Sequence, residues 1–327
     1  MISLYKYTIL ILLLLIVSCS SKNTFKPLII NGSYKKIKNI EYKLKNIKSN
    51  HIILSNNSVI INEKSNTKIY NLRKNYQFIN YSDNKIISTN NRGKMLVDNT
   101  IINIDNILIA SSIKNSILAN IYSNNSFSLY NLKTKRYILK EYLSPSLIND
   151  KRVSNPIFME NILLIPTLNG KVIVINIKEN KIIKNITIDD NIDFNNIIYI
   201  KIIEEKIFIA TKNIIILIAN KTFKKKRYNI SHIASNNQNI YLSTIDGKII
   251  KLDLELNIIK ENKFKFAKFY ALAITNFIYA VESQGLLIKM DKNLKKQSIY
   301  KININENDEI GVQNNKIYFG KKIIELE

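Results

Sequence analysis

Short runs of β-branched and aromatic residues recur along most of this chain, separated by turns rich in Asn, Asp, Gly, Lys and Ser. The clearest copy, residues 162–188, predicts a strand, an Asn169-Gly170 turn, a second strand, a polar turn and a third strand. The unit returns with Asp246-Gly247 and with Gln284-Gly285 in the first turn. Such dipeptides between apolar runs are a strong hairpin signal, so we expect type I′ turns with positive φ at both central residues.

Weaker copies bring the number of units to eight. Their first turns lie near Asn57, Gly93, Asn125, Gly170, Asn213, Gly247, Gly285 and Gly320, at intervals of 32 to 45 residues. Asn adopts the left-handed conformation more easily than other non-glycine residues, so we expect Asn57, Asn125 and Asn213 to replace glycine in their turns.

A period near 40 residues, built from three or four short strands, is typical of a β-propeller. We therefore predict an all-β chain with a single propeller over residues 32–327, of eight four-stranded blades. Seven blades remain an alternative, because the intervals are uneven and the copy at Asn125 is degenerate. A β-sandwich or a solenoid is a weaker alternative, since sandwich strands do not repeat one turn pattern at this interval.

The last copy ends at Glu327, directly after its second clear strand, so it lacks an outermost strand. The segment Gly32–Leu44 precedes the first copy and is suited to supply that strand. Pairing an N-terminal strand into the final blade would close the ring and remove exposed edges, which are the main liability of open sheets.

The N-terminus predicts a lipoprotein signal peptide over residues 1–18. Thr8–Val17 is a run of ten almost wholly apolar residues, about 15 Å long as a helix, which is too short to span a bilayer. The following Ser18-Cys19 resembles the end of a bacterial lipobox. We expect Cys19, the only cysteine, to carry the lipid and residues 19–31 to form a tether; an ordinary signal peptide is the alternative. In the lipoproteins that this N-terminus resembles, aspartate after the cysteine favours retention in the inner membrane. Ser20 stands at that position here, so the resemblance implies the outer membrane, facing the periplasm.

The formal net charge of +24 has a compositional explanation. Lys, Asn and Ile are enriched together while Gly, Pro and Trp are scarce, which is typical of an AT-rich genome. We therefore expect no nucleic-acid partner and interpret lysines such as Lys224–Lys226 as solvated strand faces. A general attraction to anionic lipid stays open.

The repeat resembles that of the quinoprotein-like (PQQ-repeat) propeller family. Asp246-Gly247 followed by Lys248–Asp253 matches its pattern best, with Asn169-Gly170 and Gly285 as further matches. The chain departs from the family in having no tryptophan. Ile183, Ile259 and Ile299 occupy roughly the tryptophan's zone, so we expect isoleucine packing to dock neighbouring blades.

A lipoprotein made of one such propeller is similar to the BamB family of outer-membrane protein assembly factors. That resemblance implies a non-catalytic scaffold whose partners are the outer-membrane β-barrel assembly proteins, with no cofactor, metal or small-molecule substrate. A periplasmic adaptor or envelope-binding propeller unrelated to barrel assembly is the alternative.

Catalytic chemistry finds little support in the residues. A quinone enzyme of the same superfamily would need the missing tryptophan, and His51 and His232 are expected to be structural. Some loops that join neighbouring blades are longer than the hairpin turns, for example Ser144–Pro156 and Ile188–Asn196. They are the predicted contact loops, because rigid scaffolds present binding residues on loops.

Overall fold

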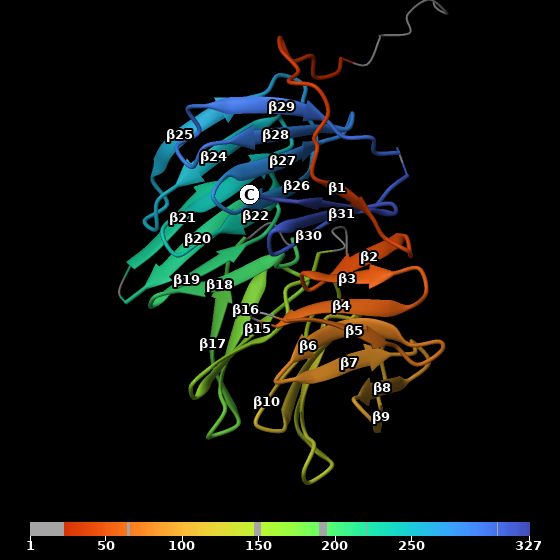
Figure 1. Ribbon diagram of the computed structural model, residues 1–327. Coiled ribbons are helices and arrows are strands. Elements are labelled where there is room, and N and C mark those ends of the chain that lie inside the picture. The colour runs from red at the N-terminus through yellow and green to blue at the C-terminus, as the bar shows by residue number, and fades with distance from the viewer. Residues whose placement is uncertain (1–22, 64–65, 147–151, 190–194, 221, 306) are drawn as a thin grey trace, which may run out of the picture.

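The computed structural model describes residues 23–63, 66–146, 152–189, 195–220, 222–305 and 307–327. In this part of the chain, 32 strands form eight separate four-stranded sheets arranged as the blades of a propeller (Figure 1). The prediction of an all-β propeller with eight four-stranded blades is confirmed, and the seven-blade alternative is wrong.

Each blade is an antiparallel meander. The strands of blades 1 to 4 are β2 (Leu44–Lys48), β3 (His51–Leu54), β4 (Ser58–Glu63) and β5 (Asn66–Asn71); β6 (Gln77–Ser82), β7 (Lys85–Thr89), β8 (Lys94–Val97) and β9 (Thr100–Asn103); β10 (Leu108–Lys114), β11 (Ile117–Tyr122), β12 (Ser126–Asn131) and β13 (Arg136–Tyr142); β14 (Ile157–Met159), β15 (Ile162–Pro166), β16 (Lys171–Asn176) and β17 (Lys181–Thr187).

Blades 5 to 8 follow the same plan. Their strands are β18 (Tyr199–Ile203), β19 (Lys206–Ala210), β20 (Ile214–Ala219) and β21 (Thr222–Arg227); β22 (Ile230–Ser235), β23 (Ile240–Thr244), β24 (Lys248–Leu252) and β25 (Ile258–Lys263); β26 (Phe269–Ile274), β27 (Ile278–Glu282), β28 (Leu286–Met290) and β29 (Gln297–Lys301); β30 (Ile310–Gln313), β31 (Lys316–Phe319), β32 (Lys322–Glu325) and β1 (Ile37–Asn39). First strands of neighbouring blades contact one another, as β22, β26 and β30 do, so they surround the central axis.

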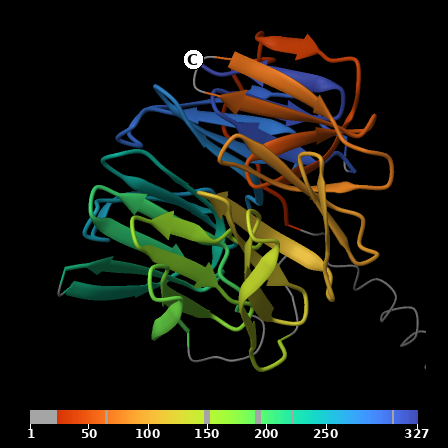
Figure 2. The same cartoon turned by 90° about the horizontal axis from the view of Figure 1, so that it is seen from below.

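The ring is closed by the N-terminal strand, as predicted. β1 pairs antiparallel with β32, bringing Ile37 opposite Ile324 and Asn39 opposite Lys322. Seen from below, the red and orange N-terminal strands lie beside the blue C-terminal ones (Figure 2). The eighth blade therefore contains both ends of the described propeller, and its outer edge is supplied by the start of the chain.

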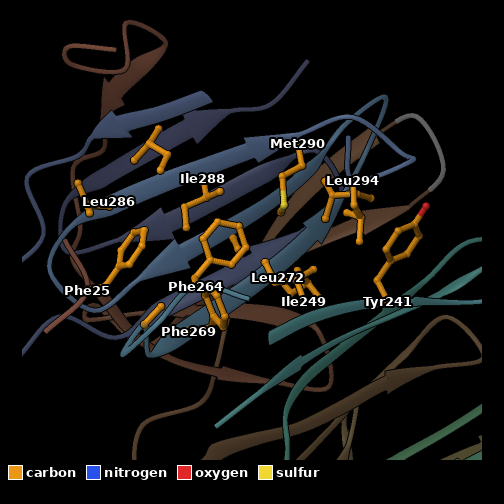
Figure 3. Close-up of a cluster of buried hydrophobic side chains, with 14 residues drawn as sticks. Phe25, Tyr241, Ile249, Phe264, Phe269, Leu272, Leu286, Ile288, Met290 and Leu294 are labelled. Atoms are coloured by element: carbon orange, nitrogen blue, oxygen red, sulfur yellow. The ribbon is translucent and has the colours of Figure 1, made fainter. Parts of the chain in front are cut away.

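The core lies between blades rather than within them. Each of the eight hydrophobic clusters joins two neighbouring blades. Between blades 6 and 7, Tyr241 and Ile249 face Phe269 and Ile288 (Figure 3). The middle strands bury both faces, which explains why β20 (IIILIA) is continuously apolar instead of alternating.

The turn type at the repeat glycines differs from the prediction. In the Ile245–Gly247 loop only Gly247 has positive φ (+84°), and its N–H donates to the Thr244 carbonyl at 3.1 Å. This is a three-residue loop, a type I turn followed by a left-handed residue, and not type I′. Paired positive φ values occur instead between the first and second strands, at Ser49-Asn50 and Asp83-Asn84.

Asparagine replaces glycine in two of the three predicted places. Asn57 and Asn125 have φ of 66° and 60°, and each donates its N–H to the carbonyl three residues back. Asn213 is not among the residues with positive φ, so the prediction for it is wrong. Its turn joins β19 and β20 through a Thr211 N–H to Ile214 carbonyl bond of 3.0 Å, which needs no left-handed residue at position 213.

A recurring hydrogen bond, here called the turn lock, fixes each connection to the next blade. In six blades the N–H of the residue that follows the outer strand donates to the carbonyl at the repeat turn, at 2.8–3.1 Å: Leu72 to Asn57, Ile104 to Gly93, Ile188 to Gly170, Tyr228 to Asn213, Phe264 to Gly247 and Ile302 to Gly285. In blade 8 the donor lies further along the chain, because Leu44, the first residue of β2, donates its N–H to the Gly320 carbonyl at 2.7 Å. In blade 3 the Asn125 side chain donates to the Ser144 carbonyl instead, at 2.7 Å. The locked backbone passes so close that a Cβ on Gly285 would lie 2.5 Å from the Ile302 oxygen.

Gly247→Ala should destabilise the propeller far more than Gly32→Ala. Both glycines have φ of +84°, but a Cβ at Gly247 would overlap the Phe264 carbonyl, whereas nothing lies within 4 Å of one at Gly32. We expect Gly32→Ala to cost about 1 kcal/mol from backbone strain and Gly247→Ala roughly 3 kcal/mol. Urea unfolding measures both, and equal losses would show that the lock tolerates a side chain.

A disulfide between β1 and β32 should stabilise the ring. Asn39 and Lys322 lie opposite each other in the two strands. The Ile40 N–H donates to the Lys321 carbonyl at 2.9 Å, so the adjacent pair of Asn39 and Lys322 is a non-hydrogen-bonded pair, whose Cα atoms are close enough for a disulfide. We expect the oxidised Asn39→Cys/Lys322→Cys protein, with Cys19→Ser, to exceed its own reduced form by about 2–4 kcal/mol in unfolding free energy. Identical stability of the two forms would mean that β1 does not hold the ring closed.

Candidate protein-binding surface

The two histidines lie in structural surroundings. His51 begins β3, with its ring 5.3 Å from that of Phe78, and burial lowers its pKa. His232 lies on β22, where its Nδ1 is 3.5 Å from the Ser243 hydroxyl. That hydroxyl belongs to a fully buried residue, so a substrate could not reach it. Among the described residues no group of three or more His, Cys, Asp or Glu is arranged to hold a metal ion.

An open depression of about 430 Å³ lies where first strands of blades 6 to 8 begin. It is lined by His232, Tyr270, Asn307, Asp308, Glu309 and Ile310. The Asp308 carboxylate is held by the Lys43 ammonium at 2.9 Å and by the Asn305 N–H at 3.2 Å. Burial raises the pKa of Asp308, but the hydrogen bonds from Lys43 and Asn305 and the charge of Lys43 together outweigh it, and the net shift is downward. This carboxylate therefore anchors the entry to blade 8.

The central channel is crossed by the chain just before blade 4. Asn155 donates to the Ser49 hydroxyl of blade 1 at 2.7 Å and accepts from the Ser111 N–H of blade 3 at 3.3 Å. Arg152 donates to the Ser231 carbonyl of blade 6. One short segment thus joins three blades across the axis, and it occupies space that a ligand would need.

The two predicted contact loops lie partly outside the described residues, at 147–151 and 190–194. Of their described ends, Asp189, Asn195 and Asn196 are 1–2% exposed and Pro156 is buried, whereas Ser144 and Pro145 are exposed. For the four buried residues the expectation of a contact surface is wrong. A long connection in this propeller fills the axis, because the first strands enclose a space that must be packed.

The other predicted site residues have distinct places. Cys19 lies outside the described residues. Gly93, Gly170, Gly247, Gly285 and Gly320 all lie in turns between second and third strands. Asp246 accepts from the Lys263 ammonium at 2.7 Å and from the Thr244 hydroxyl at 2.5 Å, which ties the turn to the outer strand. These contacts make Asp246 part of the turn's own structure.

The outer strands of three consecutive blades carry exposed apolar side chains. Ile183 on β17, Phe223 on β21 and Ile259 on β25 are 50–54% exposed near the start of their strands (strands labelled in Figure 1). Ile183 and Ile259 are left unpaired at bulges in the register, so the prediction that they dock neighbouring blades is wrong for both. Ile299, in contrast, is buried in the cluster between blades 6 and 7.

Lysines also lie on the same outer strands, most densely on β21, which reads Thr-Phe-Lys-Lys-Lys-Arg. Sequence reasoning identified Lys224–Lys226 as a strand face but not as the edge of a blade. The sequence did contain a signal that these lysines lie on a blade edge, namely their position in the repeat. The strand that follows the polar turn is the outermost strand of each blade.

The outer edge of blade 7 is covered by the chain itself. The Lys301 N–H donates to the Gly32 carbonyl at 2.8 Å, and the Tyr34 backbone N–H donates to the Lys301 carbonyl at 3.0 Å. These two bonds make Ser33 and Lys301 a parallel β-bridge. Asn31 adds two hydrogen bonds to Ile299. Residues 31–34 therefore add a short segment to β29, through three main-chain hydrogen bonds and one to the Asn31 side chain. Of the predicted tether, Phe25 and Asn31 thus contact the propeller.

Asn155→Ala should lower the unfolding free energy by about 1–3 kcal/mol, because it leaves the buried Ser111 N–H without this acceptor. Hydrogen exchange at the Ser111 amide should accelerate. Ser154→Ala is the matched control, since the Ser154 hydroxyl makes only a long 3.5 Å contact to the Asn155 carbonyl. If the two variants behave alike, the crossing segment does not hold the channel.

No protein-family model matches this chain. Among curated proteins it is 26% identical over 197 residues to the plasminogen-binding protein PgbB of Helicobacter pylori strain J99, and 26% identical over 196 residues to PgbB of strain 26695. Each match covers 59% of this chain and 36% of the relative. The chain thus spans little more than a third of the length of these relatives.

Three solved structures share the fold over most of the chain. BamB from Moraxella catarrhalis superposes with a TM-score of 0.64 at 10% identity, covering 88% of this chain and 98% of its own. The C-terminal WD40 domain of Sif2 has a TM-score of 0.61 at 14% identity, covering 89% of this chain and 98% of its own. The computationally designed protein Ika8 has a TM-score of 0.57 at 10% identity, covering 90% of this chain and 99% of its own. At these identities the likeness shows a common β-propeller architecture.

Proposed function

We propose that this chain is a non-catalytic, lipid-anchored scaffold at the periplasmic face of the outer membrane, which binds partner proteins of β-barrel assembly through the open edges of its blades. Cys19 carries the lipid in this proposal, and no cofactor, nucleic acid or small-molecule substrate takes part. No helix in the described part of the chain is long and apolar enough to cross a membrane. The lipid would therefore supply the attachment.

The observation that carries the proposal is the segment bound to β29. Residues 31–34 are a segment of chain that an outer strand of this propeller binds through its outward N–H and C=O groups. Peptide recognition by strand addition uses the same groups, with side chains setting specificity. β17, β21 and β25 are outermost strands of the same kind, each paired on one side within the described chain.

β21 is the edge whose chemistry is most selective. The Tyr228 N–H donates to the Asn213 carbonyl, directly before the paired strand β20. Because N–H groups alternate in direction along a strand, those of Phe223 and Lys225 point away from the sheet. Lysines on an edge discourage pairing with neutral chains. Beside the exposed Phe223 they favour an acidic partner strand with an apolar residue.

The partner class is supported by the BamB-like architecture together with the predicted lipid anchor. An envelope adaptor unrelated to barrel assembly remains the alternative. The relationship to PgbB favours plasminogen binding as a second candidate function. All three would bind a protein, so the experiment must identify the partner.

Lys225→Pro should abolish strand addition at β21 while leaving the fold intact. Besides the lysine charge, proline removes the outward N–H of residue 225, which makes no hydrogen bond to β20. Edge strands tolerate proline where the N–H faces solvent. Lys225→Ala removes the same charge but keeps the N–H, so it is the matched control. With a photocrosslinker replacing Phe223 in intact cells, we expect adducts to barrel-assembly proteins or nascent barrels that Lys225→Pro reduces at least several-fold and Lys225→Ala reduces little.

Other outcomes discriminate among the proposals. Adducts to unrelated envelope proteins would favour the adaptor. Binding of purified plasminogen to the intact protein, unaffected by Lys225→Pro, would favour the second candidate at another surface. Equal adduct yields from both variants would exclude strand addition at β21.

A further inference from the structure

Three consecutive aliphatic side chains stand in solvent just after the start of the described chain. Leu28, Ile29 and Ile30 are 103%, 72% and 38% exposed. Aliphatic residues are ordinarily the most buried in a protein, and a run of three this exposed is unusual in a chain that otherwise buries its isoleucines well. Figure 1 shows this red segment standing beyond β29.

Both ends of the run are fixed to blade 7. On one side Phe25 is buried, packs edge-on to Phe264 at 5.8 Å, and accepts a hydrogen bond on its carbonyl from the Gln284 side chain at 2.8 Å (Figure 3). On the other side Asn31 is hydrogen-bonded to Ile299. The intervening residues are therefore held out as a loop, here called the apolar loop (residues 26–30).

The neighbouring turns add exposed apolar side chains to the same face. Phe264 donates to the Gly247 carbonyl and its own carbonyl accepts from Ala267, which places Phe266 at the tip of a tight turn. Phe266 is 44% exposed with φ of +66°, a strained conformation for an aromatic residue that here directs it outward. Ile245, in the turn that contains Gly247, is 67% exposed.

Three exposed lysines accompany these side chains. Lys26 lies in the apolar loop, and Lys265 and Lys268 flank Phe266 and Ala267. The Lys265 ammonium lies 5.1 Å from the centre of the Phe266 ring. Aliphatic and aromatic tips surrounded by lysines suit a bilayer interface, because apolar groups enter the acyl region while ammonium groups stay at anionic headgroups.

The position of the predicted anchor decides in favour of lipid over a protein partner. Cys19 precedes Phe25 by six residues, and six fully extended residues span at most about 20 Å. If Cys19 is lipidated, Phe25 must therefore lie close to the membrane surface. We propose that the apolar loop, together with Phe266 and Ile245, docks into the bilayer that holds the lipid and sets the orientation of the propeller. This inference rests on the proposed lipidation of Cys19.

The test uses the absence of tryptophan from the sequence. Ile29→Trp places one reporter in the apolar loop, and Ile69→Trp places one at a similarly exposed site, 64%, on β5 of blade 1. Each full-length lipidated protein is reconstituted in phosphatidylcholine–phosphatidylglycerol vesicles that contain a brominated phospholipid. We expect at least threefold quenching of tryptophan fluorescence at position 29 and little at position 69. Without phosphatidylglycerol, or with Lys265→Gln/Lys268→Gln, quenching at position 29 should fall.

Vesicle flotation separates the two proposals. If the Ile29→Trp protein floats with the vesicles and shows no more quenching than Ile69→Trp, the lipid anchor stands and the docking inference is wrong. If Cys19→Ser does not alter fatty-acid labelling, the proposed lipidation is wrong and the docking inference loses its basis. Intact melting of both tryptophan variants shows that the reporters leave the fold unchanged.

Discussion

The turn lock is the interaction on which the rest of the propeller depends. It fixes the departing chain to the preceding turn, so that each blade determines where the next begins. The neighbouring backbone passes close to the turn, which is why glycine occupies the position in blades 2, 4, 6 and 7; in blade 8 the atoms nearest to a Cβ on Gly320 belong to the Asp308 side chain. Where asparagine stands instead, its side chain adds a contact, as Asn57 does to the Tyr76 carbonyl at 3.4 Å. The lock thus explains why five of the seven glycines recur at the repeat turns.

Locked blades leave their faces to pack against one another. Eight inter-blade clusters follow, and the chain needs no disulfide to hold them. The outer strands contribute least to these clusters, so they are free to carry lysines and exposed apolar residues. The strands of each blade therefore differ in role: the inner strands build the ring, and the outermost strand carries the exposed side chains.

The sequence predicted what depends on local chemistry. Eight repeats, their turns and a closing strand within Gly32–Leu44 could be identified because hairpin signals and strand counts are local. Features set by register could not. Ile183 and Ile259 became exposed through bulges that no single-residue preference reveals. Asn155 reached the axis because a ring encloses space that some connection must fill, and only the closed ring shows which one.

The closing strand also imposes an order on assembly. Lys38 of β1 and Glu325 of β32, which form an ion pair at 2.9 Å, are 287 positions apart in the chain. Synthesis delivers β1 first and β32 last, whereas the hairpins of the first seven blades need only their own residues. Until β32 arrives, β1 has no partner and the growing ring keeps an open edge of the kind that attracts other chains. The time taken to synthesise about 290 residues is therefore the period in which a chaperone or a protease has most access to this protein.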